Sequence, residues 1–216
     1  MKAIMYHYVR EYKSDLPKFK FLDIQNFRKQ LDYFEQKYGF VSRKDWDLVI
    51  KTKKLGSFEG KVILTFDDSL SCHFDYVFPE LKKRNLWGIF FVSTQPYINF
   101  KMLNVHKVHL LCGAVDGPLL LNALYGFLKE DMISDSKIKD FRNETYLKQS
   151  NYEGISEFKR ILNFFVNYEY RANLIDKVAR IVGYKFNASN FYLSKDKLKE
   201  MCSYGNIVGA HSVTHP

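Results

Sequence analysis

The sequence predicts an α/β fold, in which short buried parallel strands alternate with helices. Two apolar runs carry this prediction: the β-branched run at residues 62–66 follows Gly60, and a second run at 207–210 follows Gly205. Before and between these runs, apolar residues recur at helical spacing. The first half of the chain is therefore predicted to have strands and helices in β-α-β order. This order fits part of an irregular (β/α) barrel.

The first hundred residues supply most of these elements. Short apolar patterns predict strands at residues 3–7, 62–66 and 87–92. A polar and aromatic loop over residues 12–22 precedes a helix that begins behind Asp23, a good N-cap. Asp45 is expected to cap a second helix that continues through Lys54, and a third helix is expected at residues 76–82.

From about residue 100 the pattern becomes helical. Apolar residues recur at helical spacing over 119–181, which indicates about five helices, and no strand is expected before residues 191–193. We therefore expect residues 100–190 to form a helical insertion within a single domain of residues 1–216. Such a cap can shape access to a site, or it can be a packing or oligomer surface. The oligomeric state is left open.

Composition limits the class of protein. A chain of 216 residues with 46% hydrophobic residues can bury a sizeable core. No apolar stretch is long enough to span a bilayer, and the N-terminus lacks the apolar region of a signal peptide. The odd set of cysteines, Cys72, Cys112 and Cys202, lacks C-x-x-C spacing and suits a reducing compartment. We expect a cytoplasmic protein without a transmembrane segment.

The chain is basic, with a formal net charge of +9 and a pI of about 9.3. Such a charge can attract nucleic acid or anionic lipid. The sequence has no glycine-rich phosphate loop, helix-turn-helix signature or RNP motif, so we expect no nucleic-acid partner. Solvated basic helix faces explain the charge, and an acidic sugar polymer or a nucleotide-linked sugar would also favour such a surface.

Adjacent carboxylates, Asp67 and Asp68, follow the predicted strand at 62–66. They therefore lie at its carboxyl end, where α/β folds place their functional sites. Because the two acids repel each other, one tends to need a cation while the other can act as a base. A turn or a helix N-cap is the alternative role for such an Asp pair.

Two histidines, His211 and His215, follow the predicted strand at 207–210. They are four positions apart and would share one face if the segment were helical. Neutral imidazoles at this spacing can hold one metal ion. A purely structural histidine pair is the alternative.

Together these motifs resemble those of the polysaccharide deacetylase family, also called the NodB-homology or carbohydrate esterase family 4 group. Residues 65–68 match its T-F-D-D motif, and residues 211–216 match its H-S/T-x-x-H-P motif, in family order. Residues 3–7 end in Met-Tyr-His and resemble the N-terminal segment of a branch in which the barrel is circularly permuted. The resemblance implies a NodB-type barrel.

The resemblance also implies roles for five residues. Asp67 would be the catalytic base, and Asp68, His211 and His215 would hold one divalent metal ion. Zinc is the default for this ligand set, although other first-row ions are possible. His7 would be the catalytic acid. The implied activity is metal-dependent removal of an N-acetyl group from an amino sugar in a polysaccharide, oligosaccharide or sugar precursor.

The chain departs from the family pattern in two respects. Asp67 and His211 are 144 positions apart, which the predicted helical insertion explains, and the sequence ends on the second motif at Pro216. We therefore expect a barrel that is incomplete at the C-terminus. Two alternatives stay open: a catalytically incomplete pseudoenzyme that binds glycans, and a fragment with an interaction role.

Overall fold

The computed structural model describes residues 1–54, 58–133 and 152–215. Part of the predicted helical insertion, 134–151, and Pro216 of the second motif lie outside the described residues. The described chain forms two compact units, which we treat separately. The sheet unit contains residues 1–12, 21–101 and 187–215, and the helical unit contains residues 13–20 and 102–186. That residues 1–216 act as one domain stays a prediction.

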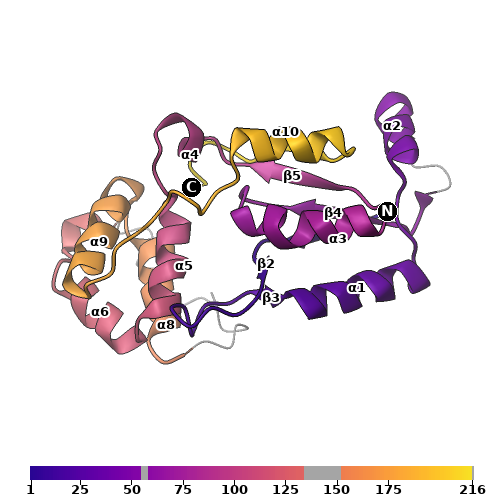
Figure 1. Cartoon of the computed structure of the whole chain (residues 1–216). Coiled ribbons are helices and arrows are strands. Elements are labelled where there is room, and N and C mark those ends of the chain that lie inside the picture. The colour runs from indigo at the N-terminus through magenta and orange to yellow at the C-terminus, as the bar shows by residue number, and fades with distance from the viewer. Residues whose placement is uncertain (55–57, 134–151, 216) are drawn as a thin grey trace. The chain divides into compact units, whose positions relative to one another are not determined.

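A four-stranded parallel sheet organises the sheet unit (Figure 1). Its strands, in spatial order, are β1 (Lys2–Tyr6), β4 (Val62–Phe66), β5 (Gly88–Val92) and β6 (Ile207–Ala210). Every neighbouring pair is parallel, so the carboxyl ends of all four strands lie at one edge. This arrangement confirms the predicted α/β fold class. A short parallel pair that the sequence did not predict comprises β2 (Val9–Arg10) and β3 (Leu22–Asp23).

Helices cover both faces of this sheet. The helices of this unit are α1 (Ile24–Lys37), α2 (Arg43–Thr52), η2 (His73–Val77), α3 (Phe78–Lys83), α4 (Gln95–Ile98) and α10 (Lys195–Ser203), and all of them except α4 contribute residues to the cores on the two faces. Alternate residues of a strand point to opposite faces. On one face, Leu64, Phe66 and Phe90 are buried in a core that includes residues of α1, α3 and α10. On the other, Ile63 and Ile89 share a smaller core with residues of α2.

Local capping explains where two helices begin. Asp23 accepts a hydrogen bond from the backbone N–H of Gln25, as its predicted role as the N-cap of α1 requires. The cap predicted at Asp45 was wrong, because Ser42 is the N-cap of α2 and Asp45 completes a capping box from the third helical position. The helix also ends at Thr52, since Lys53 adopts a left-handed conformation with φ of 58°.

The strand predicted at residues 191–193 is not present. In its place the structure has one antiparallel bridge between Leu70 and Tyr192. The backbone N–H of Leu193 donates to the carbonyl of Ser69 at 2.8 Å, and that of Ser71 donates to the carbonyl of Phe191 at 2.9 Å. The segment therefore pairs with the loop after β4 rather than with the sheet.

The helical unit has a separate hydrophobic core. Its described helices are α5 (Asn104–Ala114), α6 (Gly117–Tyr125), η3 (Glu130–Met132), α8 (Ile155–Arg160), η4 (Ile161–Phe165) and α9 (Tyr168–Ile181). Leu111, Leu120, Phe158, Leu162 and Val178 are fully or almost fully buried where these helices meet. The helical character predicted for this part of the sequence holds for its described residues.

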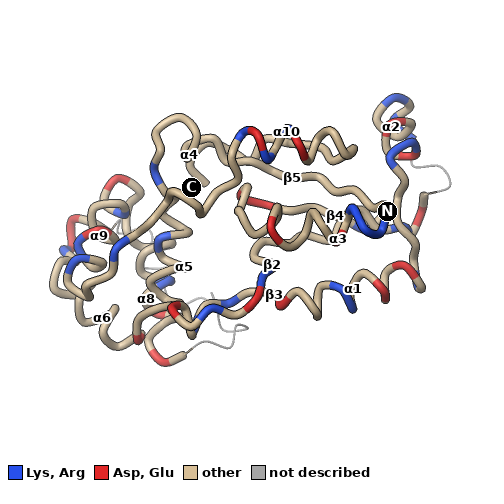
Figure 2. The backbone as a smooth tube through the Cα atoms, in the orientation of Figure 1, with Lys and Arg blue, Asp and Glu red and all other residues tan. Residues whose placement is uncertain are grey.

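Charged residues of both signs occur along α1 and α10, as Figure 2 shows. These two helices therefore do not carry basic residues alone, and solvated basic helix faces stay a prediction. Among the described residues, no helix has the length and apolar character needed to cross a bilayer.

A buried carboxylate joins α1 to α3. Glu80 is only 4% exposed and accepts hydrogen bonds from Nε of Arg28 at 2.9 Å and from Nε of Arg84 at 2.7 Å. Arg84 also donates to Asp32 of α1 at 2.6 Å. Burial alone would raise the pKa of Glu80, but the hydrogen bonds and charges of the two arginines prevail and hold that pKa below its ordinary value.

We expect Glu80→Gln to lower the free energy of unfolding by about 1–3 kcal/mol at neutral pH, because two charge-assisted hydrogen bonds are weakened. The pKa of Glu80 is lower in the folded than in the unfolded state. Its stabilisation is therefore complete above the unfolded pKa and is lost as the pH falls through the folded pKa. Denaturant unfolding at a series of pH values should show the difference from wild type shrinking below about pH 4.5.

The control for this experiment is Glu35→Gln. The side chain of Glu35 is 66% exposed and lies 4.0 Å from Arg84, so its removal should change stability by less than about 0.5 kcal/mol. Equal losses for the two variants would contradict the account.

Candidate metal centre

The carboxyl edge of the sheet assembles the site. His7 follows β1, Asp67 and Asp68 follow β4, and His211 follows β6. Backbone hydrogen bonds extend the parallel ladders past the strand ends: the N–H of Asp67 donates to Tyr6, and the N–H of His211 donates to Val92, each at 2.9 Å. The backbone hydrogen bonds therefore fix the positions of the Cα atoms of Asp67 and His211.

Asp68, His211 and His215 converge. Oδ1 of Asp68 lies 3.6 Å from Nε2 of His211 and 3.6 Å from Nε2 of His215. One possible ligand atom from each of the three lies within 4.8 Å of those of the other two. Asp68 is buried and the two imidazoles are partly exposed, so the group is open on one side. The three residues predicted as ligands form a group that can hold a metal ion.

The donor chemistry of this group fits a divalent ion. Nε2 of His211 is buried and has no hydrogen-bond partner among the described residues. An unsatisfied buried polar atom is costly, and ligation would satisfy this one. Two imidazole nitrogens and one carboxylate oxygen, with an open side, match the ligand set of catalytic zinc sites. Several first-row ions accept the same donors.

The two histidines are brought together by a turn, and not by the helix that was considered as one way to align them. Residues 211–215 form no helix, and Ser212 and His215 have left-handed backbones with φ of 64° and 51°. The hydroxyl of Ser212 accepts a hydrogen bond from the N–H of His215 at 3.0 Å. This reversal brings the two imidazole rings to 5.1 Å between centroids.

The loop after β4 has an equally unusual backbone. Asp68 and Ser69 have φ of 76° and 50°. Seven non-glycine residues of the described chain have positive φ, and four of them lie in the two loops that carry the metal group. Each such residue costs free energy, so the surrounding structure must hold it in place. Here the N–H of Ser69 donates to the carbonyl of Phe91 at 3.2 Å, and its own carbonyl accepts from Leu193.

Asp67 lies beside the group of three. Its Oδ2 is 3.9 Å from Nε2 of His211, and the residue is 5% exposed. Burial raises the pKa of this carboxyl, while the nearby imidazoles of His211 and His7 act in the opposite direction.

The structure also brings His7 to the site. Nε2 of His7 lies 3.8 Å from Oδ2 of Asp68, on a side chain that is 36% exposed. All five residues that the sequence singled out therefore lie together at the sheet edge. Their roles stay a proposal.

His73 is a residue that the sequence reasoning missed. It is fully buried, and its Nε2 lies 2.6 Å from the backbone carbonyl of His7. Its ring packs against Phe66 and Phe90, with centroids 5.6 and 5.8 Å away. The contact holds the strand end that carries His7. The one signal in the sequence was a histidine in an apolar stretch soon after Asp67.

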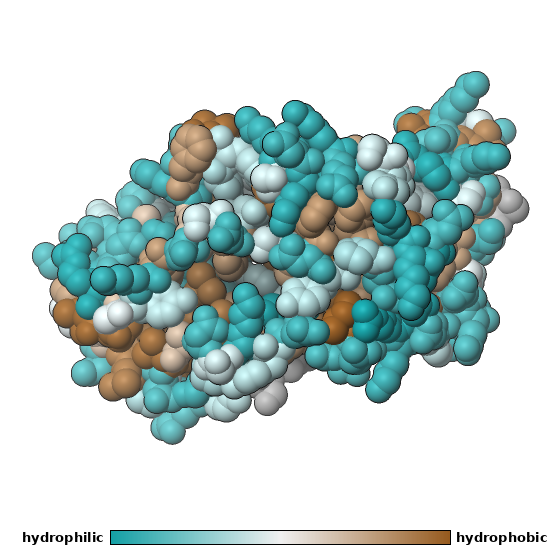
Figure 3. Space-filling model, in the orientation of Figure 1, coloured by the Kyte–Doolittle hydropathy of each residue, from teal (hydrophilic) through white to brown (hydrophobic). Residues whose placement is uncertain are grey.

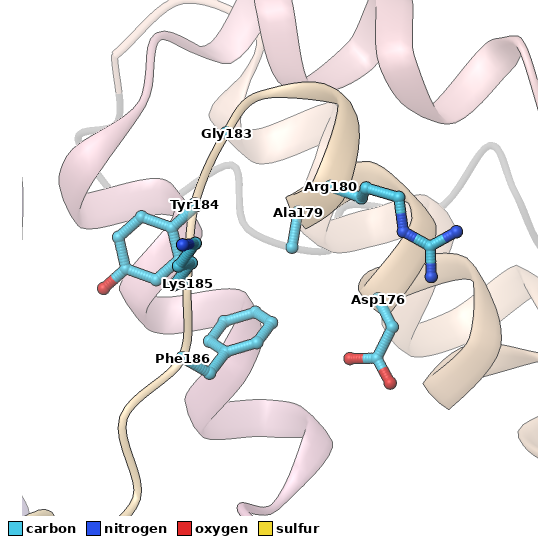
Figure 4. Close-up of a pocket in the computed structure, with 7 residues that line it drawn as sticks. All are labelled: Asp176, Ala179, Arg180, Gly183, Tyr184, Lys185 and Phe186. Atoms are coloured by element: carbon cyan, nitrogen blue, oxygen red, sulfur yellow. The ribbon is translucent and has the colours of Figure 1, made fainter.

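The helical unit contains a pocket formed by other residues than those of the metal group. It has a volume of about 280 Å³ and is formed by Asp176, Ala179 and Arg180 of α9 together with the segment 183–186 (Figure 4). Asp176 is paired with Lys107 at 2.6 Å. None of the residues predicted for catalysis or metal binding lines it.

Comparisons with known proteins were made by sequence and by structure. A scan against protein-family models finds no match, and a search of curated proteins also finds none. Solved structures do match. The deacetylase PplD of Streptococcus pyogenes, in complex with acetate, aligns with a TM-score of 0.46 and 15% identity over 99% of this chain and 57% of that one. This chain thus spans little more than half the length of that deacetylase.

Two further structures align over nearly the whole chain. IcaB from Ammonifex degensii gives a TM-score of 0.36 and 17% identity, covering 98% of this chain and 84% of that one. A de-N-acetylase from Aggregatibacter actinomycetemcomitans gives 0.35 and 16%, covering 99% and 95%. Two of these three proteins are a deacetylase and a de-N-acetylase.

Proposed function

We propose that this protein is a metal-dependent hydrolase that removes the N-acetyl group from an amino sugar of a carbohydrate. The observation that supports the proposal is the convergence of Asp68, His211 and His215 beside the buried carboxylate of Asp67. Amide hydrolysis needs an activated water, a proton acceptor and a proton donor, and this edge of the sheet offers a residue for each need.

Each residue has a separate part in the proposed reaction. Asp68, His211 and His215 would hold a divalent ion, zinc by default, which lowers the pKa of water and polarises an acyl carbonyl. Asp67 accepts the proton of the attacking water, for which its buried position suits it. His7, which lies near the Oδ2 oxygen of Asp68, donates a proton to the departing sugar amine.

The metal assignment is tested by His215→Ala. Wild-type protein should bind about one divalent ion per chain, and the variant should lose most of it, because two remaining ligands make a poor site. Zinc content after equilibrium dialysis measures this directly. His109→Ala, which removes a histidine of the helical unit, is the control and should keep full occupancy. Full occupancy in His215→Ala would rule the assignment out.

The two neighbouring acids should respond differently to substitution. Asp67→Asn should keep the metal and lose turnover, because an amide cannot accept the proton of water. Asp68→Asn should weaken metal binding as well, because its carboxylate is a proposed ligand. Metal affinity and acetate release are measured on the same preparations. If both variants lost metal to the same degree, this division of roles would be wrong.

The role of His7 is tested by His7→Ala. Loss of the proton donor should lower turnover by roughly a hundredfold or more, while metal affinity changes little. Acetate release from N-acetylated oligosaccharides and zinc binding are the two measurements. A fully active variant would show that the proton comes from another group.

A further inference from the structure

We propose that a pocket of the sheet unit is a subsite for a sugar residue that carries an anionic group, either a carboxylate or a phosphate. This inference rests on the proposed function, because it names the class of substrate for the same site. The pocket has a volume of about 530 Å³. The residues that line it are Pro96, Tyr97, Phe100, Lys101, Ala188, Ser189, Tyr192, Leu193, Ser194 and Lys195.

One wall of the pocket is attached to the loop that carries Asp68. Tyr192 forms the antiparallel bridge with Leu70, and Leu193 donates its N–H to the carbonyl of Ser69 at 2.8 Å. Ser69 is the residue directly after Asp68.

The other wall is attached to the loop that carries the histidines. At the start of α4, the N–H of Thr94 donates to the carbonyl of Ser212 at 3.2 Å, and the N–H of Gln95 donates to that of Val213 at 3.0 Å. Helix α4 then leads into the pocket residues that follow it. Both walls are therefore attached to the loops of the metal centre by backbone hydrogen bonds, and this attachment is the geometric link between the pocket and that centre.

The pocket offers apolar ring surfaces. Tyr97, Phe100 and Tyr192 line it, and Phe100 is 84% exposed. Ile98 in the same segment is 64% exposed, and Figure 3 shows hydrophobic surface over α4 with hydrophilic residues around it. Exposed apolar surface with a polar rim is typical of ligand-binding grooves. The apolar faces of a sugar ring can pack on such aromatic rings.

The charge of the pocket is positive. Lys101 and Lys195 are exposed, and neither forms an ion pair with any residue of the described chain. No Asp or Glu lines the pocket. Asp196 is adjacent to Lys195 in sequence but is paired with Lys199 at 3.4 Å. Lys195 also begins α10, where the helix dipole favours an anion. Two unpaired cations beside aromatic rings fit an acidic sugar better than a neutral one.

Three probes that all contain N-acetylglucosamine test the inference. They are a hyaluronan tetrasaccharide with carboxylates, N-acetylglucosamine 1-phosphate with a phosphate, and neutral tetra-N-acetylchitotetraose, which is called chitotetraose below. Binding to zinc-loaded protein is measured by calorimetry. At least one acidic probe should bind about tenfold more tightly than chitotetraose, and added salt should reduce this preference. The acidic probe that binds more tightly than chitotetraose shows whether the anionic group is a carboxylate or a phosphate.

The matched variants are K101A/K195A and Lys83→Ala. The double variant should lose about tenfold in affinity for the acidic probe, keep its affinity for chitotetraose, and retain its zinc. Lys83→Ala removes an exposed lysine of α3 that does not line the pocket and should leave the preference intact. Equal affinity for acidic and neutral probes, or a preference that survives the double substitution, would overturn the inference.

The same experiment separates this inference from the proposed function. An acidic preference that depends on the two lysines, without acetate release from any probe, supports the subsite and contradicts the hydrolase. Acetate release without that preference supports the hydrolase and contradicts the subsite.

Discussion

The parallel hydrogen-bonding of β1, β4, β5 and β6 is the constraint on which the site depends. Tyr6 pairs with Phe66, so β1 and β4 end at the same level, and Phe66 pairs with Phe90 near the end of β5. Val92 pairs with Ala210, which brings a strand from the end of the sequence to the same edge. The residues that follow the strands consequently meet, although His211 is more than a hundred positions from Asp67 in the chain.

Packing behind the edge keeps the loops in their unusual conformations. Gly209 leaves room for the ring of Phe91, since a Cβ at this position would lie 2.8 Å from that ring. Asn206 is buried and fixes the start of β6 by accepting from the N–H of Gly88 and donating to the carbonyl of Met201, each at 2.9 Å. These contacts set the position of β6, and therefore of His211, against β5. The left-handed residues after β4 and β6 then aim the ligand atoms at one point.

The parts of this structure that depend on local chemistry could be predicted from the sequence. Short apolar strands, the cap at Asp23 and the acid and histidine motifs are all visible within a few residues of chain. Features that depend on contacts between distant residues could not. The hydrogen bond from His73 to the backbone of His7, the bridge of Tyr192 to Leu70 and the turn that brings His215 to His211 all need the folded chain. The four-residue spacing of the histidines is compatible with a helix and with a tight turn, so spacing alone could not show which of the two brings them together.

The central claim is that Asp68, His211 and His215 together hold one metal ion at this edge of the sheet. The most direct measurement is X-ray diffraction from zinc-treated crystals at energies above and below the zinc absorption edge. The account predicts one anomalous peak, present only above the edge, within bonding distance of the Asp68 carboxylate and both imidazoles, about 2.0–2.2 Å. A peak at other residues, or no peak beside these three in crystals that contain zinc, would contradict it.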